Sequence, residues 1–201
     1  MVIHNTEQVS PEVLKITSDT GLAFFIRTAY LKSVNPEDIV PDSVFDSEEE
    51  TEIIDAELAY GAEVKAMDYL SRCEQCRSGL MRKLLNKNHE KKHIELALDY
   101  LEGKKYLSDE RFSRSWLNSR KINHSEGRIK LTGELLSRGI SKEIVTESLN
   151  EYFEENDEEE LCRKDFRKIS RTCSDKEKIT RRLMAHGFSY ALIKKILSET
   201  E

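Results

Sequence analysis

The last two thirds of the chain contain the same local pattern three times, and this repetition constrains the fold more than any other feature. Each copy has a leucine in a basic, helix-forming segment and, four positions later, a residue that suits the end of a helix. The leucines are Leu84, Leu135 and Leu183, and the residues four positions on are Asn88, Gly139 and Gly187. Asparagine and glycine tolerate the left-handed backbone conformation that ends many helices. A second amphipathic segment follows each of them, so each copy predicts a helix, a corner and another helix.

A further helix is expected before each pair, over residues 66–70, 112–117 and 161–169. Each copy is then a three-helix module of roughly 40–50 residues, and modules of this size stack in tandem. The composition agrees with a mostly helical chain, because 201 residues include only 8 Gly and 3 Pro. We predict an all-α protein in which three three-helix repeats, over residues 65–108, 109–158 and 159–201, form an elongated array.

The first 64 residues are different. Residues 11–32 are expected to be extended, with a β-hairpin turn over residues 18–21. Asn35 and Pro36 predict the start of a short helix that Pro41 ends. Residues 47–50 have the sequence of a capping box, which predicts a lead-in helix from residue 47. Its apolar face is expected at four-residue spacing, at Ile54, Leu58, Ala62, Ala66 and Leu70. Residues 1–46 are therefore an acidic extension with a hairpin, and residues 47–64 lead into the first repeat.

The charge is distributed unevenly along the chain. The formal net charge is −6, but residues 1–64 carry −11 and residues 65–201 carry +5. Residues 151–160 hold seven acidic side chains and no basic one. Without them, the formal net charge of residues 65–201, the body of the chain, is +12. A basic body indicates a polyanionic or acidic partner, whereas the acidic head suggests a decoy or a docking element for a basic one.

Several classes of protein are not expected. The most apolar stretch, residues 22–26, is too short to cross a membrane, and the first five residues lack the pattern of a signal peptide. We therefore expect a cytoplasmic protein with reduced cysteines. Cys73 and Cys76 have no second ligand pair at zinc-site spacing. His89 and His93 are expected to be structural. With no phosphate loop, nucleophile elbow or carboxylate pair, we expect neither an enzyme nor a cofactor or metal.

The junction between the first two copies, Tyr-Leu-x-Asp-x-Arg-Phe over residues 106–112, and the Leu-x-x-(Arg/His)-Gly-(Ile/Phe) corners resemble the RecX family of bacterial RecA regulators. The resemblance covers residues 60–201 and is strongest over 128–149 and 179–197. The positions that match the family as structural residues are Asp109, Phe112, Leu135, Gly139, Ile140, Leu183, Gly187, Phe188 and Ile193. Ser108 stands where an acid is usual, and Asn88 with His89 replaces the glycine and apolar residue of the corner.

The resemblance implies a curved helical array and a partner, the RecA filament on single-stranded DNA. It implies a regulator of homologous recombination, DNA repair and the SOS response. Such a protein limits filament extension and lowers ATP hydrolysis, strand exchange and coprotease activity, and we expect it to act as a monomer. The acidic residues 151–160 argue against direct DNA contact at the connection between the second and third copies.

Two sets of cations are candidates for partner binding. The first recurs at or near equivalent repeat positions: Arg82, Lys83, Lys87, Arg138, Arg181 and Arg182. The second surrounds Phe112 and Trp116 and comprises Arg111, Arg114, Arg120, Lys121 and Arg128. Cations interleaved with aromatic rings bind single strands by charge and stacking. The alternatives are solvated helix faces for the first set and aromatic rings packed in the core for the second.

The leading hypothesis is a RecX-like modulator that binds the RecA filament and, at most weakly, DNA itself. Two alternatives stay open. The helix-corner-helix units also suit a direct DNA-binding protein related to the helix-turn-helix class. A generic helical scaffold for protein partners is the other alternative. The sequence does not decide between inhibition and stimulation of RecA, although the family favours inhibition.

Overall fold

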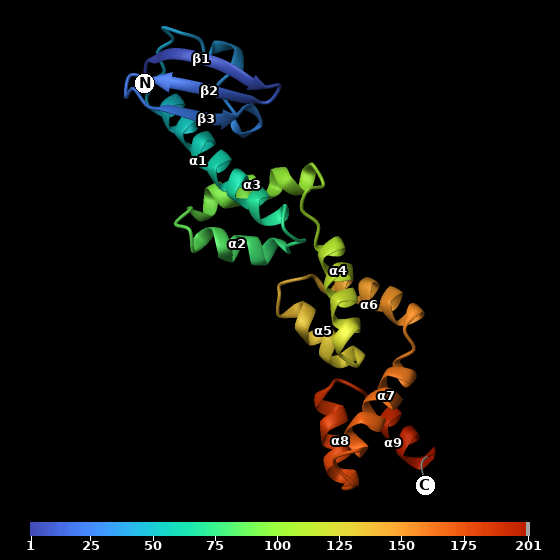
Figure 1. The fold of residues 1–201 in the computed structure, drawn as a ribbon. Helices are drawn as coiled ribbons and strands as arrows, with labels where there is room; N and C mark the ends of the chain where they lie inside the picture. Colours follow the sequence, from blue (N-terminus) through green and yellow to red (C-terminus); the bar gives the residue numbers. More distant parts are fainter. Residues whose placement is uncertain (200–201) are drawn as a thin grey trace. The chain divides into compact units, whose positions relative to one another are not determined.

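The computed structural model describes residues 1–199, which divide after Leu107 into two compact units, the first beginning at Met1 and the second at Ser108 (Figure 1). The fold is mostly helical with a small antiparallel sheet at the N-terminus, which confirms the predicted class. None of the helices described is long and apolar enough to cross a bilayer.

The sheet of the first unit has three strands rather than the two of the predicted hairpin. β1 (Ile3–Ser10), β2 (Val13–Ser18) and β3 (Ala23–Arg27) lie in the order β1-β2-β3. Ile16 in the central strand pairs with Thr6 on one side and Phe24 on the other. Sequence analysis missed β1 because it is an edge strand: within it only Ile3 is fully buried, and the polar residues that follow give no apolar alternation.

A short 3₁₀ helix, η1 (Thr28–Tyr30), follows the sheet, and a second, η2 (Pro36–Asp38), begins where it was predicted. The Asn35 side chain accepts a hydrogen bond from the Glu37 N–H and caps η2. The long helix α1 (Ser47–Leu70) is capped by Asp46, one residue earlier than expected. Asp46 accepts the N–H of Glu49, whose carboxylate accepts the N–H of Asp46 in return.

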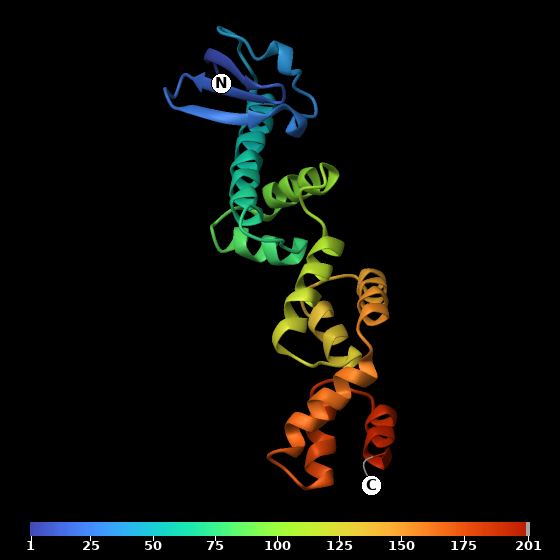
Figure 2. The same ribbon diagram turned by 45° about the vertical axis from the view of Figure 1, so that its right-hand side comes forward.

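The buried face of α1 also differs from the prediction. It consists mainly of small residues: Ile53, Ala56, Ala59, Ala62, Glu63 and Ala66. Ile54 and Leu58, expected to be buried, are 37% and 43% exposed. Strict four-residue spacing drifts around a helix with 3.6 residues per turn, so the predicted stripe begins outside the true contact face. Figure 2 shows the sheet beside the N-terminal part of α1, and α2 and α3 beside its C-terminal part.

A buried polar network joins the sheet to these helices. The Arg27 guanidinium donates to both carboxylate oxygens of Glu63 on α1, at 2.6 and 2.5 Å. The Tyr30 hydroxyl donates to the same carboxylate at 2.7 Å. Hydrogen bonds from Lys104 and Tyr100 to Glu12 hold the pKa of that carboxyl at about 2. The acidic head is therefore docked on the first repeat.

The remaining helices form the repeats. The first repeat continues from α1 with α2 (Arg77–Leu85) and α3 (Lys91–Gly103). The second repeat has α4 (Asp109–Asn123), α5 (Arg128–Leu136) and α6 (Lys142–Glu155). The third repeat has α7 (Glu158–Ser170), α8 (Lys176–Ala185) and α9 (Tyr190–Glu199). Ser108 caps α4 by accepting the Arg111 N–H, and Asp175 caps α8 by accepting the N–H groups of Glu177 and Lys178.

The corners of the three repeats share one geometry. The backbone φ is +64° at Asn88, +82° at Gly139 and +91° at Gly187, so the predicted left-handed positions are confirmed. In each corner the N–H of the next residue reaches back to the carbonyl of the repeated leucine: His89 to Leu84, Ile140 to Leu135 and Phe188 to Leu183. This is the Schellman motif, in which the residue after the left-handed position packs against the helix it ends. Ile140 and Phe188 are buried, as expected.

Within the second unit, the start of α5 is bonded to the corner of the third repeat. The N–H of Gly127 donates to the His186 carbonyl at 2.9 Å, and the N–H of Ile129 donates to the Gly187 carbonyl at 3.1 Å. The Glu158 carboxylate accepts the Arg128 N–H at 2.8 Å. These bonds satisfy amides that a helix N-terminus otherwise leaves without partners. The second and third repeats are thus joined through their backbones.

Candidate functional site

The cations predicted at the outer corners are exposed. Arg82, Lys83 and Lys87 lie on α2 and its corner, and Lys83 donates to the Gln75 side chain at 2.6 Å. On α8, Arg181 and Arg182 are exposed, and Arg181 approaches Glu177 only to 3.9 Å. These two groups belong to different units of the chain.

The aromatic pair on α4 is half buried, so it lies at the border of the core rather than inside it. The fully buried side chains of α4 are Ser113 and Leu117, each one position along from Phe112 and Trp116. The aromatic pair therefore borders the buried stripe. Two guanidinium groups approach the Trp116 ring, that of Arg138 at 4.7 Å from the ring centroid and that of Arg120 at 5.5 Å. This geometry is a double cation–π contact.

The recurrent basic position in the corner has a structural role in the second and third repeats. Arg138 folds back onto Trp116 of α4, the first helix of its own repeat. His186 occupies the matching corner position and lies 2.6 Å from the Asp165 carboxylate on α7, again the first helix of its repeat. Arg138 and His186 thus hold a corner to a helix instead of extending a row of free cations.

Other cations of the predicted α4 cluster also have partners within the chain. Arg114 forms two hydrogen bonds with Glu151, at 2.7 and 2.8 Å. Arg128 donates to Asn150 and lies 4.8 Å from the Phe153 ring centroid. Arg111 is half buried and Lys121 is exposed. The structure therefore brings Arg120 and Arg138 together at Trp116 but does not assemble this set into one surface of free charge.

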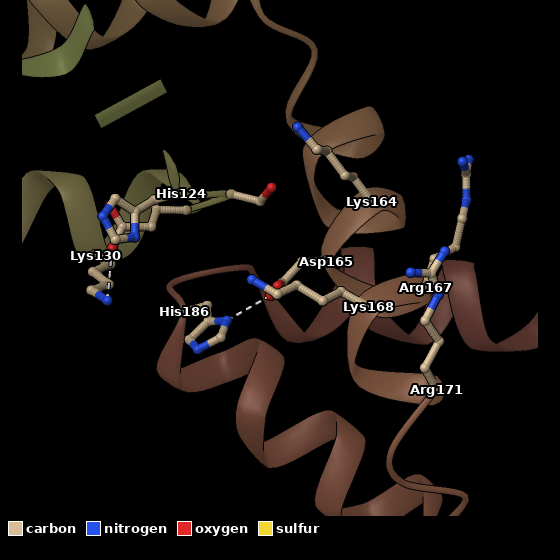
Figure 3. A pocket seen from close by; sticks show the side chains of 10 residues that line it. His124, Lys130, Lys164, Asp165, Arg167, Lys168, Arg171 and His186 are labelled. Carbon is tan, nitrogen blue, oxygen red and sulfur yellow. Dashed lines mark hydrogen bonds and ion pairs between the residues drawn. The ribbon is translucent and has the colours of Figure 1, made fainter. Parts of the chain in front are cut away.

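A groove between the second and third repeats gathers other cations. It has a volume of about 500 Å³, and its lining comprises His124, Ser125, Glu126, Lys130, Lys164, Asp165, Arg167, Lys168, Arg171 and His186. We call this cavity the inter-repeat groove. Lys164 and Lys168 extend from α7 toward the residues of the opposite wall (Figure 3). Sequence analysis assigned a binding role to none of these residues.

The charge of the inter-repeat groove is strongly positive. Its two carboxylates are buried and already paired: Glu126 with Arg120 and Lys130, and Asp165 with His186. Although burial opposes ionisation, the hydrogen bonds from Arg120 and Lys130 keep the pKa of Glu126 below its usual value. Among the residues described, no carboxylate forms a salt bridge with four exposed cations on α7 and at its C-cap, namely Lys164, Arg167, Lys168 and Arg171.

The acidic residues 151–160 concealed this site in the sequence, and the expectation that they argue against DNA contact at this connection stays a prediction. Four of these acids accept hydrogen bonds within the chain: Glu151 from Arg114, Asp157 from the Glu159 amide, Glu158 from the Arg128 amide, and Glu159 from Lys195. The spacing of Lys164, Lys168 and Arg171 is the feature of the sequence that could have predicted this basic face. Positions i, i+4 and i+7 share one face of a helix.

The cysteines and the other histidines form no such cluster. Cys162 is buried, which raises the pKa of its thiol to about 12, and Cys76 is buried at the start of α2. His93 is buried with its Nε2 2.8 Å from an Asp55 oxygen, and burial lowers the pKa of the half-buried His89. Within residues 1–199 no three metal-ligating side chains lie close enough to hold an ion.

Comparison with known proteins identifies the family. The model described as "RecX, second three-helix domain" matches residues 108–149. Regulatory protein RecX of Treponema pallidum (strain Nichols) is 35% identical over 143 residues, which cover 71% of this chain and 87% of the relative. Regulatory protein RecX of Bacillus licheniformis is 27% identical over 206 residues, covering 95% and 78% of the two chains.

Solved structures show the same fold. The crystal structure of a regulatory protein RecX superposes with a TM-score of 0.75 at 20% identity, covering 98% of both chains. The structure of RecX from Lactobacillus salivarius gives a TM-score of 0.62 at 21% identity, covering 72% of this chain and 97% of the other. The resemblance drawn from the corners and the residue 106–112 junction is therefore confirmed. The chain belongs to the RecX family.

Proposed function

We propose that this protein regulates RecA by binding its filament on single-stranded DNA in the cytoplasm, and that it lowers filament extension without catalysis of its own. The observation that carries the proposal is the RecX family membership, which rests on tandem three-helix repeats with shared corners. A regulator that binds a nucleoprotein filament needs repeated, cationic surfaces rather than an active-site pocket. The exposed cations supply such surfaces.

Contact with RecA is assigned to the exposed predicted cations, which have few partners within the chain: Arg82, Lys83, Lys87, Arg181 and Arg182. Arg138, Arg120, Arg114 and Arg128 are assigned a supporting role, because each is held by contacts within the second repeat. This division places nine of the eleven candidates in two groups with different expected effects and leaves Arg111 and Lys121 unassigned.

The test is the single-strand-dependent ATP hydrolysis and strand exchange of RecA, measured with and without a stoichiometric excess of this protein. Both rates are expected to fall. Unchanged rates would contradict the proposal. Reversing the charge of Lys83, Lys87, Arg181 and Arg182 is expected to weaken the effect, because a charged surface is then repelled rather than attracted. A generic scaffold predicts no change in that variant.

A further inference from the structure

We propose that the inter-repeat groove binds the sugar–phosphate backbone of a single-stranded nucleic acid. The groove is a site of its own, distinct from the corner cations assigned to RecA contact. Identifying the strand as the one inside a RecA filament rests on the proposed function, whereas the affinity of the groove for phosphodiesters does not.

The inter-repeat groove supplies positive charge that is not paired with carboxylates. Lys164, Arg167, Lys168 and Arg171 are exposed and have no salt bridge to any residue between 1 and 199. A fifth cation, Lys130, stands on the opposite side and neutralises Glu126 at 2.8 Å. The carboxylates of the groove are thus already satisfied, and the cations of α7 remain available. Such cations release the counterions condensed on a nucleic-acid backbone, so they bind it more tightly at low salt.

These cations are arranged in a line along α7 and its C-cap. Lys164, Lys168 and Arg171 are spaced by four and three residues, so they share one helix face. A rise of 1.5 Å per residue spreads them over about 10 Å of helix. A line of cations suits a chain of phosphates better than a single small anion. Lys164 and Lys168 reach from this helix into the groove in Figure 3.

The polarity of the groove lining distinguishes a nucleic-acid ligand from an acidic protein segment. Every residue that lines the groove is polar or charged, and the lining includes no aliphatic or phenyl side chain. Protein–protein interfaces usually have an apolar centre and are depleted in lysine. Nucleic-acid interfaces are more polar and much more positively charged. The lining of this groove therefore favours a phosphodiester chain.

The groove is formed before any ligand binds. Its walls come from two repeats that are bonded through their backbones, Gly127 to His186 and Ile129 to Gly187. A Cβ on Gly127 would lie 2.3 Å from the Gly187 carbonyl oxygen, which shows how closely the repeats approach. A preformed site avoids the entropy cost of assembling two walls around a flexible strand.

The experiment measures binding of a fluorescein-labelled oligothymidylate by anisotropy, without RecA, over a series of salt concentrations. The test variant replaces Lys164, Arg167, Lys168 and Arg171 by Ala. If these residues contact four phosphates, the slope of log K against log salt is expected to fall by about 2.8. When salt rises from about 50 to 200 mM, the affinity of the variant is then expected to fall by a factor roughly 50-fold smaller than that of the wild type. An unchanged slope would overturn the proposal.

A matched control removes the same charge elsewhere, through Ala at Lys32, Lys91, Lys142 and Lys194, which are exposed and lie outside both the groove and the candidates for RecA contact. The control is expected to keep most of the slope of log K against log salt that the wild type shows. Equal losses in both variants would show an effect of net charge alone and overturn the proposal. Far-UV circular dichroism verifies that both variants are folded.

Two further measurements separate the outcomes. Polyglutamate at equal charge is expected to compete poorly, and displacement of the oligonucleotide by it would assign the groove to an acidic protein instead. RecA ATP hydrolysis is then measured with wild-type protein. If hydrolysis is unaffected while the groove variant loses binding to oligothymidylate, the proposed function fails and the groove assignment stands. If hydrolysis falls but the groove variant binds oligothymidylate normally, only the groove assignment fails.

Discussion

Gly187 meets two structural requirements at one residue. Its φ of +91° ends α8 in the left-handed conformation, and its backbone touches the start of α5 in the preceding repeat. A Cβ placed on it would lie 2.4 Å from both the amide nitrogen and the Cβ of Lys130. The first requirement follows from the local sequence pattern, whereas the second arises only from the packing of two repeats.

We predict that Gly187→Ala destabilises the second unit. The left-handed conformation alone costs about 1–2 kcal/mol for a residue with a Cβ, and the contact with the Lys130 backbone adds to that. Gly133→Ala is the matched control, since it lies within α5 with nothing within 4 Å of an added Cβ. That change is expected to stabilise the protein by roughly 0.5–1 kcal/mol. Urea unfolding followed by Trp116 emission measures both. Similar midpoints for the two variants would refute the contact.

At the scale of elements, the connection between the sheet and α1 depends on one ion pair. Arg27 on β3 is held by Glu63, and its guanidinium lies 4.3 Å from the Tyr100 ring centroid on α3. Glu63 is 5% exposed and also accepts the Tyr30 hydroxyl. Burial and the nearby carboxylate raise the pKa of Tyr30 above its usual value. This carboxylate places a charged side chain on the buried face of α1.

We predict that Arg27→Ala costs about 3–5 kcal/mol, because it leaves the Glu63 charge buried without its partner. Combining Arg27→Met with Glu63→Leu is expected to cost far less, since neither charge is then buried. The measurement is urea unfolding of the two variants by far-UV circular dichroism. An equal loss in both would show that packing of the Arg27 side chain, and not charge pairing, holds the sheet to α1.

At the scale of the whole molecule, each unit has its own buried core. The first unit packs its sheet on α1 and packs α2 and α3 around Leu80, Leu84 and Leu98. The second unit buries Leu131 and Leu135 in one repeat and a cluster around Leu183, Phe188 and Ile193 in the next. A segment with its own core meets the requirement for independent folding.

We predict that residues 108–201 fold alone. Trp116, the single tryptophan of the chain, lies in this fragment and reports its unfolding. The expected result is a cooperative urea transition at which Trp116 emission and far-UV circular dichroism coincide. A fragment of residues 1–107, followed by circular dichroism, serves as the counterpart. A broad, non-cooperative transition of the 108–201 fragment would contradict its independence.

The sequence by itself determined the features whose causes lie within a few residues. The three corners follow from the positions of Asn88, Gly139 and Gly187 relative to their leucines, because a Schellman motif is closed by bonds within six residues. The caps at Asn35 and Ser108 are similarly local. These features also carried the family resemblance, so family and fold class could be predicted from sequence alone.

The tertiary structure decided which charges are free. Arg114 finds Glu151 across 37 positions of sequence, and Glu126 collects Arg120 and Lys130, so cations that look alike in the sequence have different roles. The buried face of α1 and the inter-repeat groove likewise depend on distant segments. Pairing energies between such segments depend on three-dimensional separation and burial. Local spacing reports neither quantity, which is why the basic face of α7 stayed hidden beside an acidic stretch.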